Sequence, residues 1–219
     1  MISAWQGLGY NRRARNLHAA AEAIVEHHDG RVPDTLEGLL ALPGIGPYTA
    51  RAVLAFAFEQ DVAVVDTNAA RFLARGVAGR RLAPREAQEL ADSLVAPGTG
   101  WAHNQGVLDF GATICTKRSP DCDACPLRGH CAWAADGWPS PDPVEGSAGT
   151  SARQSVFEGS DRQGRGRLVD ALRLGPVVAQ DVAVVMGWPG DAHRADAVAL
   201  TVVRDGLAEF EGGSLVLPS

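Results

Sequence analysis

The chain has 219 residues, of which 46% are hydrophobic, and carries a formal net charge of −6 at pH 7. A chain of this size can bury one core of ordinary size and a second, smaller one. It contains no apolar run long enough to span a bilayer, and its N-terminus lacks the basic, apolar and small-residue order of a signal peptide. We therefore expect a cytoplasmic protein that does not insert into membranes.

The acidic charge is unevenly distributed along the chain. Residues 1–120 contain 12 basic and 12 acidic side chains, whereas residues 121–219 contain 8 and 14. A nucleic-acid-binding protein of this composition cannot rely on a broad basic field. Any contact with DNA must come from local arginine clusters and backbone amides, which predicts modest affinity and a shallow dependence on salt.

The first half of the chain is predicted to be helical throughout. The segment ISAWQGLGY has helical character, and apolar residues then recur at helical spacing from Arg12 to His27. Asp34 and Glu37 have capping-box spacing before a short helix that ends at Pro43. Further helices are expected over residues 50–58, after Asp66, and over residues 84–95 and 101–111.

The second half differs in composition. Residues 139–153 are rich in proline, glycine and serine, which is typical of a linker. Beyond them, helices are expected over residues 163–174, 177–186 and 191–205, with a hairpin around Gly212 and Gly213. Three helices followed by a hairpin indicate a winged helix. The predicted domains are a helical core (1–112), a cysteine-rich loop (113–138), the linker (139–153) and a winged-helix-like α+β domain (154–219).

A glycine-rich turn, LPGIGPYTA, joins two of the predicted helices. Pro43, Gly44 and Gly46 stand between two apolar helix ends, so the backbone must turn sharply there. The amides from Ile45 to Tyr48 would lie at the N-terminus of the second helix, aligned with its dipole, and would bind an anion such as a DNA phosphate. An ordinary helical hairpin with glycine caps is the alternative.

All four cysteines lie within one span with the pattern C-x6-C-x2-C-x5-C. Four soft thiolate ligands so close together in a cytoplasmic chain favour a metal centre over two disulfides. Zinc sites commonly use two CxxC pairs and only one is present, so the loop lengths favour a [4Fe-4S] cluster over zinc. Arg118, between the first two cysteines, offers a positive charge to a phosphate. The predicted ligands are Cys115, Cys122, Cys125 and Cys131.

Three motifs together resemble one known family. The hairpin LPGIGPYTA, the aspartate Asp66 in VVDTNAARFLAR and the cysteine loop are similar to those of the helix-hairpin-helix DNA glycosylases of the endonuclease III superfamily. Within it, GLGYNRRARNLHAAA and Asn68 resemble the adenine DNA glycosylases (MutY). The resemblance covers about residues 1–138. It implies a mainly α, six-helix-barrel-type domain, N-terminally incomplete, that carries a structural iron-sulfur cluster.

The resemblance also implies roles for individual residues. Asp66 would stabilise positive charge on the deoxyribose or capture the sugar covalently, and Asn68 would orient the carboxylate or the water. Tyr48 stands where endonuclease III carries the lysine that attacks the sugar, so a hydrolytic, monofunctional enzyme is expected. Tyr10 matches a tyrosine that wedges into the duplex beside oxidised guanine. By its position alone Asp66 is predicted to be a helix N-cap, and a core aromatic is the alternative for Tyr10.

The activity expected from the resemblance is excision of adenine mispaired with 8-oxoguanine or guanine in double-stranded DNA. The expected enzyme is a monomer associated with the nucleoid, with Gly44, Ile45 and Gly46 on the DNA and a monovalent cation at the hairpin. Two alternatives remain. One is a non-catalytic DNA-binding protein that uses hairpin, cluster and winged helix, and the other is a bifunctional glycosylase and lyase of the endonuclease III type.

The sequence departs from the family at both ends. The family carries, before the GLGY helix, a glutamate that protonates adenine and a glutamine-rich helix that enters the DNA, whereas this sequence begins after both. A missing general acid commonly costs about 10²- to 10⁴-fold in rate, so we expect weakened activity, explained by a start codon placed too far downstream or by a true remnant. We favour the first account. Residues 156–219 are too short for the domain with which many members recognise 8-oxoguanine, and contact of Arg162, Arg165 and Arg167 with DNA stays open.

Overall fold

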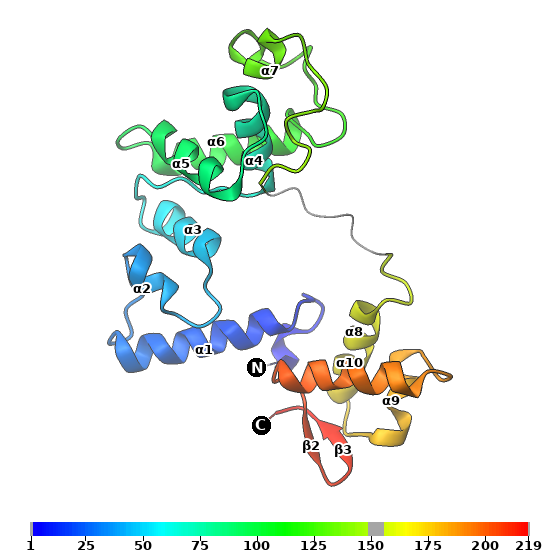
Figure 1. Ribbon diagram of the computed structural model, residues 1–219. Helices are drawn as coiled ribbons and strands as arrows, with labels where there is room; N and C mark the ends of the chain where they lie inside the picture. Colours follow the sequence, from blue (N-terminus) through cyan, green and yellow to red (C-terminus); the bar gives the residue numbers. More distant parts are fainter. Residues whose placement is uncertain (1, 149–155, 219) are drawn as a thin grey trace. The chain divides into compact units, whose positions relative to one another are not determined.

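The structure, a computed structural model, describes residues 2–148 and 156–218 (Figure 1). It is mainly helical, with one small sheet among the described residues. The chain divides into two compact units. The terminal unit comprises the described parts of residues 1–32, 42–44 and 154–219, and the central unit those of residues 33–41 and 45–153. No helix in these ranges is both long enough and apolar enough to cross a bilayer.

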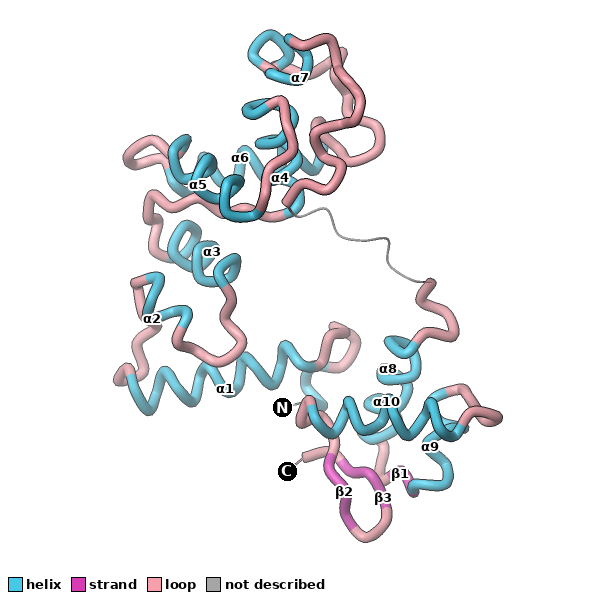
Figure 2. Tube along the Cα trace, in the orientation of Figure 1, coloured by secondary structure: helices cyan, strands magenta, loops and turns pink. Residues whose placement is uncertain are grey.

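The central unit is a set of short helices (Figure 2). They pack around small side chains. α4 (Thr67–Phe72) packs mainly against α6 (Gly100–Thr113), and α2 (Leu36–Leu40) packs against α3 (Pro47–Ala57). Alanines dominate its largest buried cluster, which lets neighbouring helices approach closely. The other helical elements are α5 (Pro84–Leu94), η3 (Arg128–His130) and α7 (Ala132–Ala135).

α4 continues without a break into η2 (Leu73–Ala78), a turn of π-helix. Such turns are rare and are found mostly at functional sites. η2 packs against α7, and it ends at Gly79, whose φ of +62° favours glycine. A Cβ at Gly79 would approach the Ala132 side chain to 3.1 Å. The close contact brings η2 against the segment that follows the last cysteine.

The terminal unit joins the two ends of the chain. η1 (Ile2–Trp5) and α1 (Arg12–His27) belong to the same unit as the C-terminal helices. Ile2 is buried in one hydrophobic core with Leu168 and Val202. The Arg173 guanidinium donates to the Ile2 carbonyl oxygen, at 3.3 Å from Nη2, and to Asn11 Oδ1 at 3.0 Å. The N-terminal residues are therefore held by the C-terminal part of the chain.

The C-terminal part confirms the predicted order of three helices and a hairpin. α8 (Asp161–Leu172), α9 (Val182–Met186) and α10 (Ala192–Arg204) precede β2 (Glu209–Glu211) and β3 (Ser214–Val216). The prediction of one helix over residues 177–186 is wrong. Its first part forms β1 (Val177–Val178) and the turn η4 (Ala179–Asp181), and β1 pairs with β3 in an antiparallel sheet of order β1-β3-β2. Two residues are too few to show an alternating pattern, so β1 depends on its partner strand.

The N-terminal segment ISAWQGLGY is not a helix, contrary to the prediction. Only Ile2–Trp5 form a turn of 3-10 helix. Gly7, Gly9 and Tyr10 then adopt φ values of +82°, +65° and +47°, which a right-handed helix cannot accommodate. The two glycines favour this looped path, and their effect outweighs the helical propensity of their neighbours.

Two further local predictions need correction. Thr35, and not Asp34, caps α2, because its Oγ1 accepts from the Gly38 N–H at 3.2 Å. The described part of the predicted linker, residues 139–148, is not free: Val144 and Ala148 are buried. The composition of residues 139–148 is typical of a linker, but their burial depends on partners that are distant in sequence, such as Leu82, whose carbonyl accepts from the Ala148 N–H. The rest of the predicted linker, 149–155, lies outside the described residues.

Candidate functional site

The turn between α2 and α3 has the geometry that its glycines predict. Gly44 has a φ of +74°, and a Cβ there would collide with the Asn16 side chain. Gly46 is the N-cap of α3, supplies no capping side chain, and is followed by Pro47. The amides of Tyr48 and Thr49 lie in the first helical turn, where they have no acceptor within the helix. This turn therefore offers backbone donors at the positive end of a helix dipole.

Asp66 is the N-cap of α4, as the sequence predicts, and its carboxylate is held by three hydrogen bonds. Oδ1 accepts from the backbone N–H groups of Asn68 and Ala69, both at 2.7 Å. Oδ2 accepts from the Asn68 side-chain amide at 2.8 Å. A carboxylate has about four lone-pair positions, so Oδ2 keeps one for a further partner. The half-buried carboxylate is thus fixed in orientation while one acceptor direction remains open.

Hydrogen bonds connect this carboxylate to the cysteine loop. Asn68 Oδ1 accepts from Arg71 Nη2 at 2.6 Å, and the same nitrogen donates to the Gly111 carbonyl at 2.8 Å. Arg71 is buried, and its Nε lies 3.4 Å from the carbonyl oxygen of Cys115. A continuous series of contacts therefore runs from Asp66 through Asn68 and Arg71 to the first cysteine.

Asn104 on α6 fixes the extended segment that leads to Asp66. Its Oδ1 accepts from the Val64 N–H at 2.7 Å, and its Nδ2 donates to the carbonyls of Val62, at 2.8 Å, and Gly100, at 2.7 Å. Asn104 is only 2% exposed. Breaking these hydrogen bonds would leave the buried amide of Asn104 without partners, so they hold the backbone of this segment in place.

Tyr48 lies in the first turn of α3 and is 50% exposed. Within the described residues its hydroxyl makes no hydrogen bond, so the structure does not include it in the Asp66 network. Tyr48, which stands where a lysine is expected in endonuclease III, is nevertheless on the surface, where a ligand can reach it.

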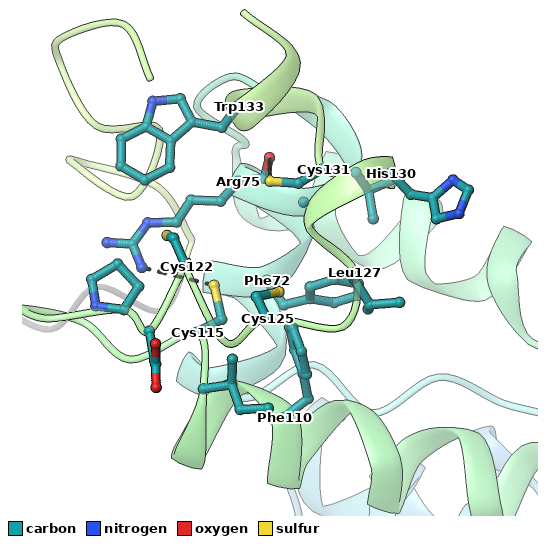
Figure 3. A pocket seen from close by; sticks show the side chains of 15 residues that line it. Phe72, Arg75, Phe110, Cys115, Cys122, Cys125, Leu127, His130, Cys131 and Trp133 are labelled. Carbon is teal, nitrogen blue, oxygen red and sulfur yellow. Dashed lines mark hydrogen bonds between the residues drawn. The ribbon is translucent and has the colours of Figure 1, made fainter. Parts of the chain in front are cut away.

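The four cysteines line one cavity of about 350 Å³ (Figure 3). All four are free thiols and partly buried. In the described part of the chain, no three His, Cys, Asp or Glu side chains are arranged to hold a single metal ion. The cavity is also many times the roughly 30 Å³ that one water occupies in the liquid, so it has room for a group of several atoms. The donor set and the space fit an iron-sulfur cluster better than one zinc ion.

Arg75 on η2 holds the loop that carries the first cysteine. It is 2% exposed, and its Nη1 donates to the Thr116 carbonyl at 2.7 Å and approaches Cys115 Sγ at 3.8 Å. Its Nε donates to Asp142 Oδ1 at 2.9 Å and its Nη2 to Asp142 Oδ2 at 2.5 Å. The guanidinium also stacks on the Trp133 ring, with its carbon 5.2 Å from the ring centroid. One buried cation therefore joins η2, the cysteine loop and the segment after it.

The electrostatics of this cluster of groups follow from burial and from the ion pair. Burial alone lowers the pKa of Arg75, but the hydrogen bonds and charges of Asp142 and Cys115 outweigh it and raise the pKa. Burial by itself raises the pKa of Asp142, but the hydrogen bonds from Arg75 and the Val144 N–H and the charge of Arg75 outweigh it, so the pKa is lowered. Burial raises the pKa of the Cys115 thiol, against the opposing effect of Arg75.

Sequence reasoning missed three members of this arrangement. Arg71 and Arg75, which follow Asp66, are four residues apart within an apolar run, and two arginines at helical spacing among apolar residues are a signal that could have been noticed. Asp142 gave no such signal, because it stands in a segment of linker-like composition.

Two predicted DNA contacts lie on the surface. Tyr10 is 68% exposed, which excludes the alternative of a core aromatic. Arg118 is exposed on the loop between the first two cysteines. The two residues belong to different units.

Curated relatives match almost the whole chain. An adenine DNA glycosylase of Mycolicibacterium smegmatis is 41% identical over 215 residues, which are 95% of this chain and 70% of that protein. The chain belongs to the adenine DNA glycosylase family. Another member, from Mycobacterium tuberculosis H37Rv, is 39% identical over 212 residues, or 94% of this chain and 67% of that protein. The human adenine DNA glycosylase is 41% identical over 133 residues, which are 58% of this chain and 24% of that protein.

Family models and solved structures agree with this membership. A helix-hairpin-helix motif model matches residues 27–56, and a model of the iron-sulfur binding domain of endonuclease III matches residues 115–131. A thermostable thymine-DNA glycosylase superposes with a TM-score of 0.52 and 33% identity, covering 57% of this chain and 60% of that chain. A trapped endonuclease III–DNA covalent intermediate superposes with a TM-score of 0.52 and 25% identity, covering 61% and 62%.

The matched span of the iron-sulfur model begins at Cys115 and ends at Cys131, the outermost of the four cysteines that line the cavity. The match supports an iron-sulfur cluster in this member of the adenine DNA glycosylase family, and the four cysteines are the candidate ligands.

Proposed function

We propose that the chain hydrolyses the N-glycosidic bond of adenine mispaired with 8-oxoguanine or guanine in double-stranded DNA. It would act as a monofunctional glycosylase and as a monomer at the nucleoid. The names of the relatives suggest the base that is removed. The proposal rests above all on one observation, the Asp66 carboxylate held by three donors with one acceptor position open.

Asp66 is proposed to act on the sugar. Departure of the base leaves positive charge on the deoxyribose, and a carboxylate near C1′ stabilises that charge or bonds to the carbon, as in glycosidases. Because its donors already fix Asp66, the carboxylate needs little reorganisation when the charge develops. Asn68 is a positioning residue in this proposal, since it donates to Asp66 and is itself held by Arg71.

The hairpin is proposed to bind the DNA backbone. The amides around Gly44, Ile45 and Gly46 would meet a phosphate, and carbonyl oxygens of the same turn would coordinate a monovalent cation. Tyr48 has no amine and cannot form a Schiff base with the sugar, which supports hydrolysis without strand cleavage. The cluster is proposed to be [4Fe-4S], with Arg118 on its loop facing a phosphate and Tyr10 entering the base stack.

The test is single-turnover release of adenine from a duplex that carries adenine opposite 8-oxoguanine. It uses the chain as printed and, in parallel, a version begun at an upstream in-frame start if the gene contains one. Asp66→Asn keeps an acceptor for the helix cap but removes the charge, and we expect release at least about 10²-fold slower.

Asp61→Asn provides a matched control. Asp61 also accepts backbone N–H groups beside a helix N-terminus, from Gly98 at 2.7 Å and Gly100 at 2.9 Å, but has no proposed role in catalysis. This variant should release adenine at the wild-type rate. Absence of release by both wild-type versions, or equal release by wild type and Asp66→Asn, refutes the proposal. A covalent adduct trapped by borohydride would show a lyase instead.

A further inference from the structure

Residues of α10, of strands β2 and β3 and of the turn that leads into α9 line a hollow in the terminal unit. Its volume is about 230 Å³, and we call it the α10–β2 hollow. Every lining side chain except that of Asp196 is apolar. The volume is several times the roughly 30 Å³ that one water occupies in the liquid, so the hollow has room for one large apolar side chain.

The rim of the hollow carries two large apolar side chains that solvent reaches. Leu200 on α10 is 56% exposed and Phe210 on β2 is 57% exposed, whereas Leu215 between them is 1% exposed. Single exposed apolar residues are ordinary on a protein surface, but two of them at the mouth of one apolar hollow are not scattered. A further apolar side chain placed there would be removed from water together with the rim.

Strand β2 forms an edge of the sheet beside this hollow (Figure 2). The strand order is β1-β3-β2, so among the described residues β2 has a paired strand on one side only. Gly212 and Gly213, with φ values of +55° and +83°, form the two-residue turn that fixes the register of β2 against β3. An edge strand presents backbone N–H and C=O groups with which a further strand can pair.

The side chains of β2 differ between its two faces. Phe210 pairs with Leu215, and both line the hollow. Because successive side chains of a strand point to opposite faces, Glu209 and Glu211 lie on the other face of the sheet. A strand added beside β2 would therefore place apolar residues on the side of the hollow and its alternate residues next to two carboxylates.

The surroundings of this edge are acidic. Glu209 and Glu211 are exposed, and residues 206–219 contain no Lys or Arg. The described ion pairs between arginines and carboxylates of the terminal unit involve other acids, namely Asp161, Asp170 and Asp205. Asp196, Glu209 and Glu211 therefore offer negative charges to a ligand.

The two arginines of α10 do not line the hollow. Arg194, in the first turn of α10, donates to Asp161 at 2.7 Å and stacks on the Trp188 ring, with its guanidinium carbon 4.0 Å from the centroid. Arg204 is the last residue of α10, two turns after Asp196. Asp196 is thus the charged residue at the hollow itself, and its sign is the same as that of the two glutamates.

Charge decides which occupant fits. A nucleic-acid phosphate would meet Glu209 and Glu211, which repel it. A second copy of the chain that paired β2 with its own β2 would bring glutamates of the two strands next to one another, and like charges across a strand pair are destabilising. An extended segment with basic residues at alternate positions would meet the opposite charge on one face and the apolar hollow on the other.

We infer that β2 and the α10–β2 hollow bind an extended segment of a partner protein in which Lys or Arg alternates with apolar residues. The segment adds to the sheet as a strand beside β2, so that backbone hydrogen bonds hold it and alternate side chains are recognised. One apolar side chain enters the hollow, and its basic neighbours face Glu209 and Glu211. The inference does not depend on the proposed function.

The test is fluorescence anisotropy of labelled peptides titrated with the full chain. The probe is KVKLKVK, in which lysines occupy one face of a strand and apolar residues the other. The comparison peptides are EVELEVE, which reverses the charge, and KKVLVKK, which keeps the composition of the probe but not the alternation. We expect the wild-type chain to bind KVKLKVK at least about tenfold more tightly than either comparison peptide.

Reversing the charge of the edge tests the pairing directly. Glu209→Lys combined with Glu211→Lys should weaken binding of KVKLKVK at least about tenfold and strengthen that of EVELEVE. Glu22→Lys combined with Glu26→Lys is the matched control, because it makes the same change in net charge at exposed positions of α1. This control should bind both peptides as the wild type does. A misfolded variant would not gain affinity for EVELEVE, so unfolding cannot imitate the expected result.

The hollow is tested at its rim. Leu200→Gln should weaken binding of KVKLKVK at least about fivefold, because it places a polar group where the apolar side chain docks. Leu200→Met keeps an apolar side chain of similar volume and should preserve the affinity.

Strand addition is tested in the backbone of the peptide. Alternate N–H groups of a strand point to opposite sides, so only one set can face β2. Two versions of KVKLKVK are methylated at alternate backbone nitrogens, in the two possible phases. One phase should lose binding and the other should retain it.

Four results would overturn the inference. The first is absence of measurable KVKLKVK binding, or equal binding of the three peptides, by the wild-type chain. The second is an equal effect of the charge reversals on β2 and on α1, which would indicate the overall charge of the chain. The third is an equal effect of methylation in both phases, and the fourth is displacement of the bound peptide by a DNA duplex, which would make the same surface a nucleic-acid site.

Discussion

The buried ion pair between Arg75 and Asp142 allows a quantitative test of how the cysteine loop is held. We consider Asp142→Asn, which preserves the shape of the side chain and its acceptor for the Val144 N–H. The change removes the negative charge that faces Arg75 in two hydrogen bonds, at 2.9 and 2.5 Å. Arg75 would keep its bonds to the carbonyls of Thr116 and Lys117 but would be a buried cation that has lost its carboxylate partner.

The expected magnitude follows from the burial of the two partners. Removing one partner of a fully buried ion pair costs about 3–5 kcal/mol, because the other charge is left desolvated. The Arg75 side chain is 2% exposed, but that of Asp142 is 25% exposed, so water already screens part of the interaction. We therefore expect a loss of about 2–3 kcal/mol in the free energy of unfolding, which lowers the melting temperature by about 5–10 °C for a chain of this size.

The assay is thermal unfolding followed by circular dichroism, together with retention of the visible absorbance of the iron-sulfur cluster. Glu89→Gln is the control, because it breaks the Arg85–Glu89 pair, whose side chains are 90% and 62% exposed, respectively. An exposed pair of this kind contributes at most about 0.5 kcal/mol. If Asp142→Asn melts at the same temperature as Glu89→Gln and holds its cluster equally well, the argument that this ion pair stabilises the loop is wrong.

Three further predictions concern the surroundings of Asp66. Arg71→Lys removes the fork that reaches Asn68 and the Gly111 carbonyl, and should lower the unfolding free energy by about 2 kcal/mol in urea titrations and slow adenine release. Gly111→Ala would place a Cβ 2.5 Å from the Asn68 carbonyl oxygen. We therefore expect the free energy of unfolding to fall by about 1–3 kcal/mol in the same titration, and adenine release to slow. A neutral effect would show that α4 and α6 are loosely packed. Hydrogen bonds from the Gly98 and Gly100 N–H groups lower the pKa of Asp61 in the folded protein. The ionised Asp61 therefore stabilises the fold fully above its pKa in the unfolded chain, about 3.9, and this stabilisation is lost as the pH falls through its lower pKa in the folded protein. Asp61→Asn should therefore lower the urea midpoint at neutral pH and leave it unchanged below both pKa values.

The parts of this protein that the sequence predicts correctly are governed by neighbours along the chain. The glycines of the hairpin, the cap at Asp66 and the helical periodicity of α1 and α5 each act within one or two turns. The spacing of the cysteines is similarly local, and it suffices to indicate a metal centre. Family resemblance adds the proposed role of Asp66, which its position as a helix cap does not reveal.

Local rules fail where two of them compete or where a partner is distant. Around Gly7 and Gly9 the backbone follows the glycines and not the helical propensity of their neighbours. β1 exists only because β3, more than thirty residues later, offers it a partner edge. In the first case two local rules compete within one segment, and in the second the deciding partner lies outside the segment.

The amino-acid sequence by itself indicated most of the helices, the glycine turn, the cysteine pattern and the candidate carboxylate. Only the tertiary structure decided which charges meet: Asp142 with Arg75, which are 67 positions apart, and Arg165 with Asp205, which are 40 apart. The physical reason is that a guanidinium and a carboxylate attract one another wherever the fold places them, and no periodic pattern in the chain records the pairing. The terminal unit has the same origin, because its residues come from both ends of the sequence and meet only when the unit has packed.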